Sequence, residues 1–339
     1  MTLRKEQDLD QHPMAHNVAL ADSVPIIDIN ALANGQATQQ EINEIAQACK
    51  EWGFFQVVNH GVSEELIKSA WKRTKQFFAL PMTEKESLLR TKDNPWGYYN
   101  NELTKNQRDK KEVFDYTHSG TDPIYGAKNR WLTEQKAFKS AMLEYYAACS
   151  HLSMQLLQAF CQGMDLPPDF LYKDFEGNHT GFIRLNYYPV DDPMKGSRFE
   201  PQAEVGLGVH HHTDAGAFTI LLQDEVGGLQ VHKDGHWHDI PPTPNAFVIN
   251  TADMMQVWSN DRYKAAVHRV QAMTTTDRYS IPFFFNPAAG AKISPLPTVI
   301  SADRPKRYQT IEWAQFRGKR SEGDYADYGA EVQISQFKI

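Results

Sequence analysis

The spacing of apolar residues predicts three amphipathic helices in the first half of the chain. Apolar positions recur every three or four residues within residues 42–52, 67–77 and 138–160. This spacing places them along one face of a helix, and the third stretch is the longest of the three. Ser63 precedes the second stretch and suits an N-cap. We interpret the three apolar faces as surfaces that pack on a common core.

After Gly181 the pattern changes to short β-rich runs separated by Gly, Pro, Asn and Asp. The predicted strands of this half are residues 182–188, 205–212, 218–222, 229–232, 236–240, 246–250, 255–258, 267–273 and 279–285. Lys233-Asp234-Gly235 carries an Asp-Gly hairpin signal. Many short strands at close spacing indicate an antiparallel sandwich or barrel. Two further strands are predicted earlier, at 24–29 and 54–58.

We therefore expect one structural unit of mixed, mainly β class, with helices from the first half packed outside a barrel. The predicted parts are a flexible arm, an N-terminal α/β region, the barrel core and a C-terminal segment. They span residues 1–23, 24–180, 181–290 and 291–339 respectively.

Composition narrows the range of partners. The chain of 339 residues is 41% hydrophobic and 12% aromatic, which favours a folded core over disorder. Its net charge of -7 disfavours nucleic acid and anionic membranes, which bind basic surfaces. Its sequence has no apolar run of membrane-spanning length. We expect a small-molecule partner, and the oligomeric state stays open, with a monomer plausible.

The chain has three cysteines, Cys49, Cys149 and Cys161. An odd number at this wide spacing is neither a disulfide framework nor a zinc cluster. We expect buried thiols in a reducing compartment, which predicts a cytoplasmic protein.

The most informative motif is His212-Thr213-Asp214, at the end of a predicted strand. Residues i and i+2 of a strand point to one face, so both side chains can reach one ion. His268, in another predicted strand, completes a set of two histidines and one carboxylate. That set is typical of non-haem Fe(II) oxygenases, because it leaves coordination positions open. His210 shares the face of His212, but its acidic partner lies at i+4, so we assign only His212 to the metal.

Each signal is weak alone. A single histidine in a strand is more often packed or solvated than a ligand. Arg278 and Ser280 follow in the next predicted strand, again at i and i+2. Together they offer a two-pronged donor and a hydroxyl to a carboxylate, although an arginine taken singly more often pairs with a surface acid. The combination with the metal residues favours an anion site.

The chain resembles the isopenicillin N synthase-like family of 2-oxoglutarate/Fe(II)-dependent dioxygenases, which includes plant gibberellin and flavonoid oxidases. The segments that carry the resemblance are residues 24–28, 52–61, 207–216, 221–231, 259–264, 268–270 and 323–329. It implies a distorted double-stranded β-helix, or jelly roll, with iron bound by His212, Asp214 and His268. It also implies Asn186 and Tyr188, beside Arg278 and Ser280, as 2-oxoglutarate residues, and Phe284 as a residue that stacks on substrate.

The implied activity is hydroxylation, desaturation or cyclisation of a small organic molecule, with Fe(II), 2-oxoglutarate and O2 consumed and succinate and CO2 released. This activity is typical of secondary metabolism. Three alternatives stay open: an iron oxidase of the same fold that does not use 2-oxoglutarate, an ethylene- and succinate-forming enzyme, and a non-catalytic ligand-binding jelly roll. The sequence departs from the family pattern at residues 190–205, predicted to shape a lid, and at Ile281-Pro282, predicted to form a bulge.

Overall fold

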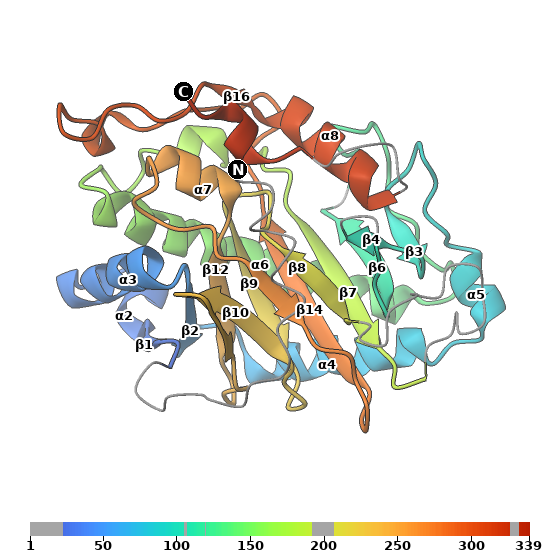
Figure 1. Ribbon diagram of the computed structural model, residues 1–339. Helices are drawn as coiled ribbons and strands as arrows, with labels where there is room; N and C mark the ends of the chain where they lie inside the picture. The colour runs from blue at the N-terminus through green and yellow to red at the C-terminus, as the bar shows by residue number, and fades with distance from the viewer. Residues whose placement is uncertain (1–22, 105–106, 119, 192–206, 326–331) are drawn as a thin grey trace.

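The computed structural model describes residues 23–104, 107–118, 120–191, 207–325 and 332–339 (Figure 1). The predicted N-terminal arm and most of the predicted lid at 190–205 lie outside the described residues.

Two β-sheets form the body of the protein, and the smaller lies in front of the larger in Figure 1. The larger sheet has eight strands in the order β1-β2-β12-β9-β14-β7-β6-β3. Their bounds are Ile26–Asp28, Phe54–Val58, Phe247–Thr251, Phe218–Gln223, Arg278–Phe285, Phe182–Tyr188, Glu112–Thr117 and Gly97–Tyr99. The smaller sheet has the order β11-β10-β13-β8, with bounds His236–Asp239, Leu229–Lys233, His268–Val270 and Val209–His212. These facing sheets are the predicted jelly roll, extended at both edges by strands from the first half of the chain.

The pairing is antiparallel throughout both sheets except between β1 and β2. Asp234 and Gly235 form the two-residue turn between β10 and β11, with φ angles of 50° and 85°. Positive φ at both central residues is the hairpin geometry that the Asp-Gly signal predicts. Two small pairs lie outside the sheets: β4 with β5 and β15 with β16, at Leu103–Thr104, Gln107–Arg108, Lys292–Ile293 and Ile311–Glu312.

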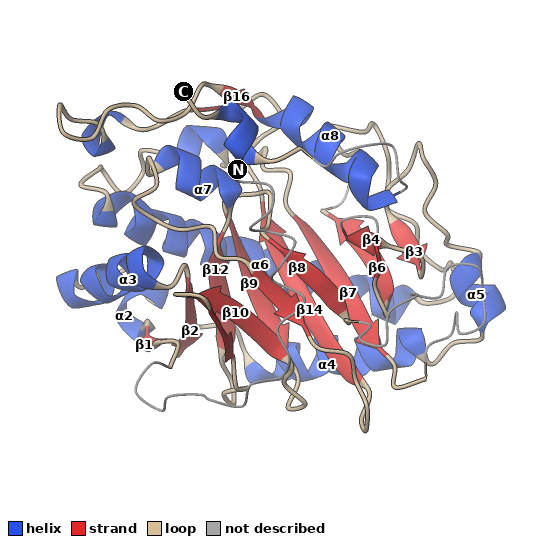
Figure 2. Ribbon diagram, in the orientation of Figure 1, coloured by secondary structure: helices blue, strands red, loops and turns tan. Residues whose placement is uncertain are grey.

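Helices α3, α4 and α6 cover the larger sheet on the side away from the smaller one, whereas α7 and α8 lie above the strands in that view (Figures 1 and 2). The long α6 packs against α3 and α4 and contacts β14. Thr38 and Glu41 form a capping box at the start of α3, and Ser63 caps α4 as its position predicts. The helix bounds are α2 Asn30–Ala33, α3 Gln39–Glu51, α4 Glu64–Phe78, α5 Met82–Glu86, α6 Lys136–Gly163, α7 Asp253–Trp258 and α8 Trp313–Tyr325. Short 3-10 turns lie at Tyr172–Asp174, Pro297–Val299 and Ile334–Phe337.

Two hydrophobic clusters result. The larger one lies between the helices and the eight-stranded sheet, with Phe77, Phe160 and Trp313 buried in it. The smaller one lies between the two sheets and includes Phe54 and Leu229. The second cluster lies beside the strands that carry the metal motif, since Val209 of β8 and Val270 of β13 belong to it.

Two local predictions are wrong. Residues 255–258 are not a strand but the end of helix α7. Met254, Met255, Val257 and Trp258 are all buried, and a short continuous apolar run looks alike for a buried strand and a buried helix. Ile281-Pro282 is not a bulge either, because β14 keeps a continuous register with β9 through Pro282. The irregular pairing lies instead between β8 and β13.

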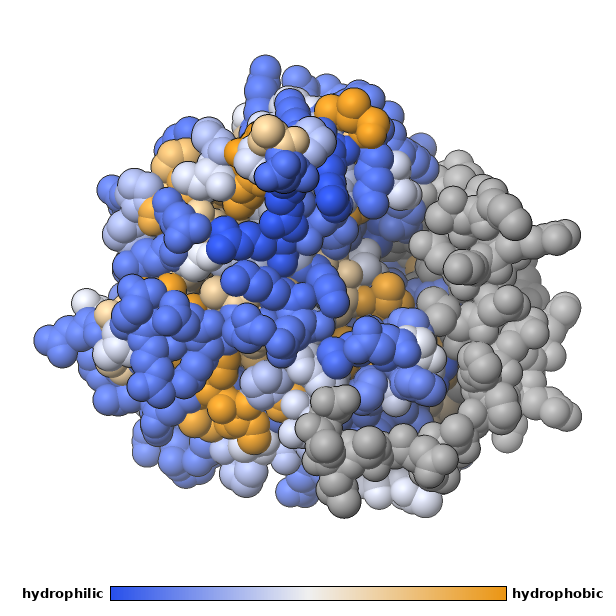
Figure 3. Space-filling model, turned by 60° about the vertical axis from the view of Figure 1, so that its left-hand side comes forward, coloured by the Kyte–Doolittle hydropathy of each residue, from blue (hydrophilic) through white to orange (hydrophobic). Residues whose placement is uncertain are grey.

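The surface shown in Figure 3 is mostly hydrophilic where it is described, with hydrophobic residues in separate small patches. Within the described residues no helix is long and apolar enough to cross a membrane. The three cysteines are free thiols and all are buried.

Candidate functional site

His212, Asp214 and His268 meet at the mouth of the barrel. His212 ends β8, and His268 begins β13 directly opposite it in the antiparallel ladder. Nε2 of His212 lies 3.5 Å from Oδ1 of Asp214, and Nε2 of His268 lies 3.7 Å from the same oxygen. One nitrogen or oxygen from each residue lies within 4.8 Å of the others. The structure thus brings together the three residues that the sequence motif selects, around a point that one cation can fill.

The tautomers of both imidazoles suit metal binding. Nδ1 of His212 donates to the carbonyl of His210 at 2.8 Å, and Nδ1 of His268 donates to the carbonyl of Ala266 at 3.1 Å. A carbonyl only accepts, so each Nδ1 carries a proton, and each Nε2 is turned to Asp214. Backbone contacts therefore fix both rings in the orientation that a metal needs.

Electrostatics favour an ionised Asp214. Burial alone would raise the pKa of its carboxyl, but His268, His212 and Asn250 hold that pKa well below its usual range. Burial and the neighbouring His212 lower the pKa of His268 to about 4, which leaves its imidazole neutral at pH 7. Burial opposes protonation of His212 as well, but the hydrogen bond to Asp214 outweighs it and raises the pKa of His212. An anionic oxygen and a neutral imidazole are the ligand states that a divalent metal requires.

Two residues that the motif analysis missed orient Asp214. Asn250 Nδ2 donates to Oδ2 of Asp214 at 2.8 Å, and Thr219 Oγ1 donates to the same oxygen at 2.5 Å. Both are buried. They occupy one carboxylate oxygen and leave Oδ1 turned to the histidines. Asn250 had a signal in the sequence, because it is a lone amide at the end of an apolar strand.

His210 has another role. It shares the strand face of His212, but its Nδ1 lies 3.0 Å from Oδ1 of Asp109. The imidazole of His210 is therefore held by Asp109. Of the three consecutive histidines 210–212, His212 is the one that joins Asp214 and His268 in the candidate metal cluster.

Arg278 lies deep inside the barrel, with its guanidinium at one end of the cavity that holds the candidate metal residues. The residue is fully buried, and its Nε donates to the carbonyl of Gly227 at 2.6 Å. Nη1 and Nη2 are buried without a hydrogen-bond partner among the described residues. An orphaned charged donor is costly in a protein interior, so this pair of nitrogens indicates a missing anion.

The other predicted anion residues face Arg278 across the ladder between β14 and β7. Tyr188 lies opposite Arg278, whose guanidinium is 4.8 Å from the tyrosine ring centre, and Asn186 lies opposite Ser280. Asn186 Nδ2 is 3.3 Å from Ser280 Oγ, while Oδ1 of Asn186 is buried without a partner among the described residues. All four line one cavity of about 540 Å³ together with the three metal residues.

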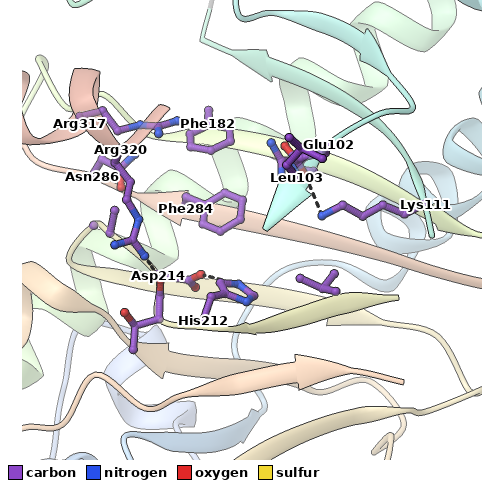
Figure 4. Close-up of a pocket in the computed structure, with 15 residues that line it drawn as sticks. Glu102, Leu103, Lys111, Phe182, His212, Asp214, Phe284, Asn286, Arg317 and Arg320 are labelled. Atoms are coloured by element: carbon purple, nitrogen blue, oxygen red, sulfur yellow. Dashed lines mark hydrogen bonds and ion pairs between the residues drawn. The ribbon is translucent and has the colours of Figure 1, made fainter. Parts of the chain in front are cut away.

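A second cavity of about 670 Å³ opens on the other side of His212 and Asp214. Figure 4 shows Phe284 between this pair and the ring of Phe182. The two phenylalanine rings stack with centres 4.6 Å apart. Phe284 lines both cavities. His212 and Asp214 thus stand where a deep polar lobe meets an outer lobe with an aromatic wall.

A network of buried charges forms the wall beyond Phe284, and motif analysis did not find it. Lys111 lies 2.7 Å from Glu102 and 3.2 Å from Asp109. Arg184 contacts Glu102 at 2.7 Å and Asp115 at 2.8 Å. Their sequence positions are up to 82 residues apart, so no local pattern joins them. Burial would raise the pKa of the Glu102 carboxyl, but the surrounding cations hold it far below its usual range.

Both halves of the site fit the groups that the resemblance implies. Two imidazole nitrogens and an ionised carboxylate oxygen suit Fe(II) with open positions. The free Nη pair of Arg278 with the Ser280 hydroxyl suits the distal carboxylate of a dicarboxylic acid. A jelly roll with these two sites side by side defines a class of non-haem iron oxygenases.

The chain belongs to the 2OG-Fe(II) oxygenase superfamily. The sequence model of that superfamily matches residues 179–287, and one described as non-haem dioxygenase in morphine synthesis N-terminal matches residues 24–134. The protein is an oxidoreductase that uses Fe(II) and 2-oxoglutarate and acts on small organic molecules.

Curated relatives are similar over nearly the whole chain. Protein DMR6-LIKE OXYGENASE 2 of Arabidopsis thaliana is 34% identical over 319 residues, covering 91% of this chain and 86% of the relative. 1-aminocyclopropane-1-carboxylate oxidase 5 of the same plant is 35% identical over 320 residues, covering 92% and 95%.

Solved structures share the fold. JOX2 in complex with 2OG, Fe and JA has a TM-score of 0.74 and 31% identity, over 87% of this chain and 83% of that one. A full-length Neurospora crassa protein in complex with alpha-KG and 5-formyluracil has a TM-score of 0.76 and 26% identity, over 91% and 99%.

Proposed function

We propose that this protein oxidises a C–H bond of a small organic molecule at the junction of the two cavities. In this proposal His212, Asp214 and His268 hold the iron, and Arg278 with Ser280 holds the distal carboxylate of 2-oxoglutarate. The observation that carries it concerns Arg278, whose buried Nη1 and Nη2 have no hydrogen-bond partner among the described residues. Arg278 lines the same cavity as His212, Asp214 and His268. When bound, Fe(II) would activate O2, the oxidant, and 2-oxoglutarate would supply two electrons as it is converted to succinate and CO2.

The protein's own residues bind, orient and exclude water. Arg278 and Ser280 fix one end of the keto acid, and Asn186 and Tyr188 line its path, so its other end is directed to the metal residues. Asn250 and Thr219 hold Asp214 so that one oxygen faces the metal. Phe54, Leu221 and Leu229 complete an apolar lining that keeps bulk water from the deep lobe.

The outer lobe is the proposed place of the prime substrate, and Phe284 is its proposed stacking residue. Phe284 is partly exposed, lines both lobes, and stands next to His212 and Asp214 in Figure 4. Solved structures of related proteins hold a further small organic ligand beside 2-oxoglutarate, which supports a small organic substrate.

Succinate formation tests this proposal. Purified protein with Fe(II), ascorbate, 2-oxoglutarate and O2 should release succinate slowly even without prime substrate, and a candidate substrate should accelerate the release. Omitting Fe(II) or O2 should abolish it. A protein that consumes O2 and oxidises its substrate without forming succinate would instead be an iron oxidase of the same fold.

Ethylene in the gas phase would point to the ethylene- and succinate-forming enzyme that the sequence leaves open. Metal-free purified protein that takes up no iron would point to a binding module. We also propose a cytoplasmic location, which the three free buried thiols support.

A further inference from the structure

Four cationic side chains line the outer lobe as the described residues form it, and three of them are already satisfied. Lys111 and Arg184 are paired with Glu102, Asp109 and Asp115. These acids are buried, so their cations are held in place.

Arg320, the third, donates to two backbone carbonyls. They belong to Val332, at 2.8 Å, and Thr213, at 2.9 Å. Arg320 therefore ties helix α8 to the segment between His212 and Asp214, and its role is structural.

Arg317 differs from the other three cations. It lies one turn before Ser321 on α8 and is only partly buried, and its Nη1 donates to Ser321 Oγ at 2.7 Å. Its guanidinium lies 5.1 Å from the centre of the Phe182 ring. Within the described part of the chain, no carboxylate lies within ion-pairing distance of it. Burial raises the pKa of the nearby Asp122 despite the opposing charge of Arg317, and Oδ1 of Asp122 accepts hydrogen bonds from the amides of Ile124 and Tyr125.

Arg317 and the candidate metal residues His212 and Asp214 lie at opposite ends of the outer lobe. Figure 4 shows Phe284 between Arg317 with Phe182 on one side and His212 with Asp214 on the other. The stacked rings of Phe182 and Phe284 make an apolar surface that joins the cation to the metal residues. A ligand that spans this surface has its charged end at Arg317 and its reactive carbon at the metal.

We propose that the prime substrate carries a carboxylate that Arg317 binds, with an apolar body lying on Phe182 and Phe284. Among the described residues, the guanidinium of Arg317 donates one hydrogen bond to a side chain, that to Ser321, and its planar fork matches a carboxylate. This inference rests on the proposed function, because it names the substrate class of the same site.

The proposed carboxylate site can be tested by ligand binding, without turnover. Benzoate, phenylacetate, 3-phenylpropionate and hexanoate are each compared with their neutral amides. They are titrated anaerobically into protein with Fe(II) and saturating 2-oxoglutarate, which occupies Arg278. The readout is the change in the weak visible band of the iron–2-oxoglutarate complex. We expect at least one carboxylate to bind roughly ten-fold more tightly than its amide, a difference of about 1.4 kcal/mol.

Variants locate the cause. Arg317→Met should remove that preference, and Arg317→Lys should keep part of it. Lys319→Met removes an exposed charge from the same helix and should behave like the wild type. The band before ligand addition reports that each variant is folded and binds 2-oxoglutarate.

The inference is overturned if no carboxylate is preferred over its amide, or if Arg317→Met keeps the preference. A wild type that forms no band at all would contradict the proposed function instead, so the two failures are distinguishable.

Discussion

The deep lobe and the charged wall of the outer lobe each hold an arginine, Arg278 fully buried and Arg184 partly buried, in opposite states of hydrogen bonding. Among the described residues, Arg278 has two terminal nitrogens without a partner, whereas Arg184 is bonded to two carboxylates. A protein that buries an unpaired cation loses stability, so such a group persists where a ligand completes it. A paired cation shapes the wall without needing a ligand. Unmet hydrogen-bonding capacity, more than charge itself, therefore marks the ligand site.

The largest loss should follow from removing a metal residue. We expect His268→Ala to lower succinate formation by roughly 1000-fold or more, because a metal centre contributes several kcal/mol to the reaction. Iron content measured after gel filtration should fall with it. His236→Ala, at an exposed histidine, is the matched control and should keep both. A fully active His268→Ala protein would refute the metal assignment.

Arg278→Met should have the next largest effect. The change removes the partner of a buried carboxylate, which costs about 2–4 kcal/mol and so weakens 2-oxoglutarate roughly 30- to 1000-fold. Iron binding should be unchanged, since Arg278 does not contact the metal residues. Calorimetric titration of 2-oxoglutarate into the iron-loaded protein measures this. An unaltered affinity would show that the keto acid binds elsewhere.

Asn250→Ala should weaken iron binding indirectly, through Asp214. It frees Oδ2 of Asp214, whose orientation then depends on Thr219 alone. We expect roughly 10- to 100-fold weaker iron binding, the usual cost of losing a group that orients a ligand. Competition with a coloured chelator gives the affinity. Excess iron should restore activity, which would not happen if the variant were simply unfolded.

Arg90→Met should have the smallest effect on 2-oxoglutarate binding, under about two-fold, although it destabilises the fold. Arg90 is buried 3.3 Å from Glu102 and 3.4 Å from Asp115 and lines neither cavity. Breaking a buried pair costs about 3–5 kcal/mol. Lys68→Met, in an exposed pair with Glu64, should cost under about 1 kcal/mol. Urea unfolding compares the two, and equal losses would contradict the account of the charged wall.

Local patterns predicted the elements and the residues close in sequence. The strand β7 and the Asp-Gly turn after β10 are set by a few neighbouring residues, and the structure has both. His212 and Asp214, and likewise Arg278 and Ser280, are two residues apart, so strand geometry alone places each pair on one face.

Features set by tertiary contacts were not predictable in this way. Helix α7 is buried on most sides, so its apolar residues do not recur every three or four positions, and its sequence shows no helical period. Lys111 and Arg184 became part of the site only through pairing of β6 and β7 with distant strands. Arg317 belongs to α8, far along the chain from the barrel strands that it faces.

The most direct measurement is a crystal structure of the protein grown anaerobically with Fe(II) and 2-oxoglutarate. We predict one metal ion coordinated by Nε2 of His212, Oδ1 of Asp214 and Nε2 of His268, and a carboxylate on both Nη atoms of Arg278. A metal ion bound away from these three residues, or a keto acid that leaves Arg278 without a partner, would contradict the account.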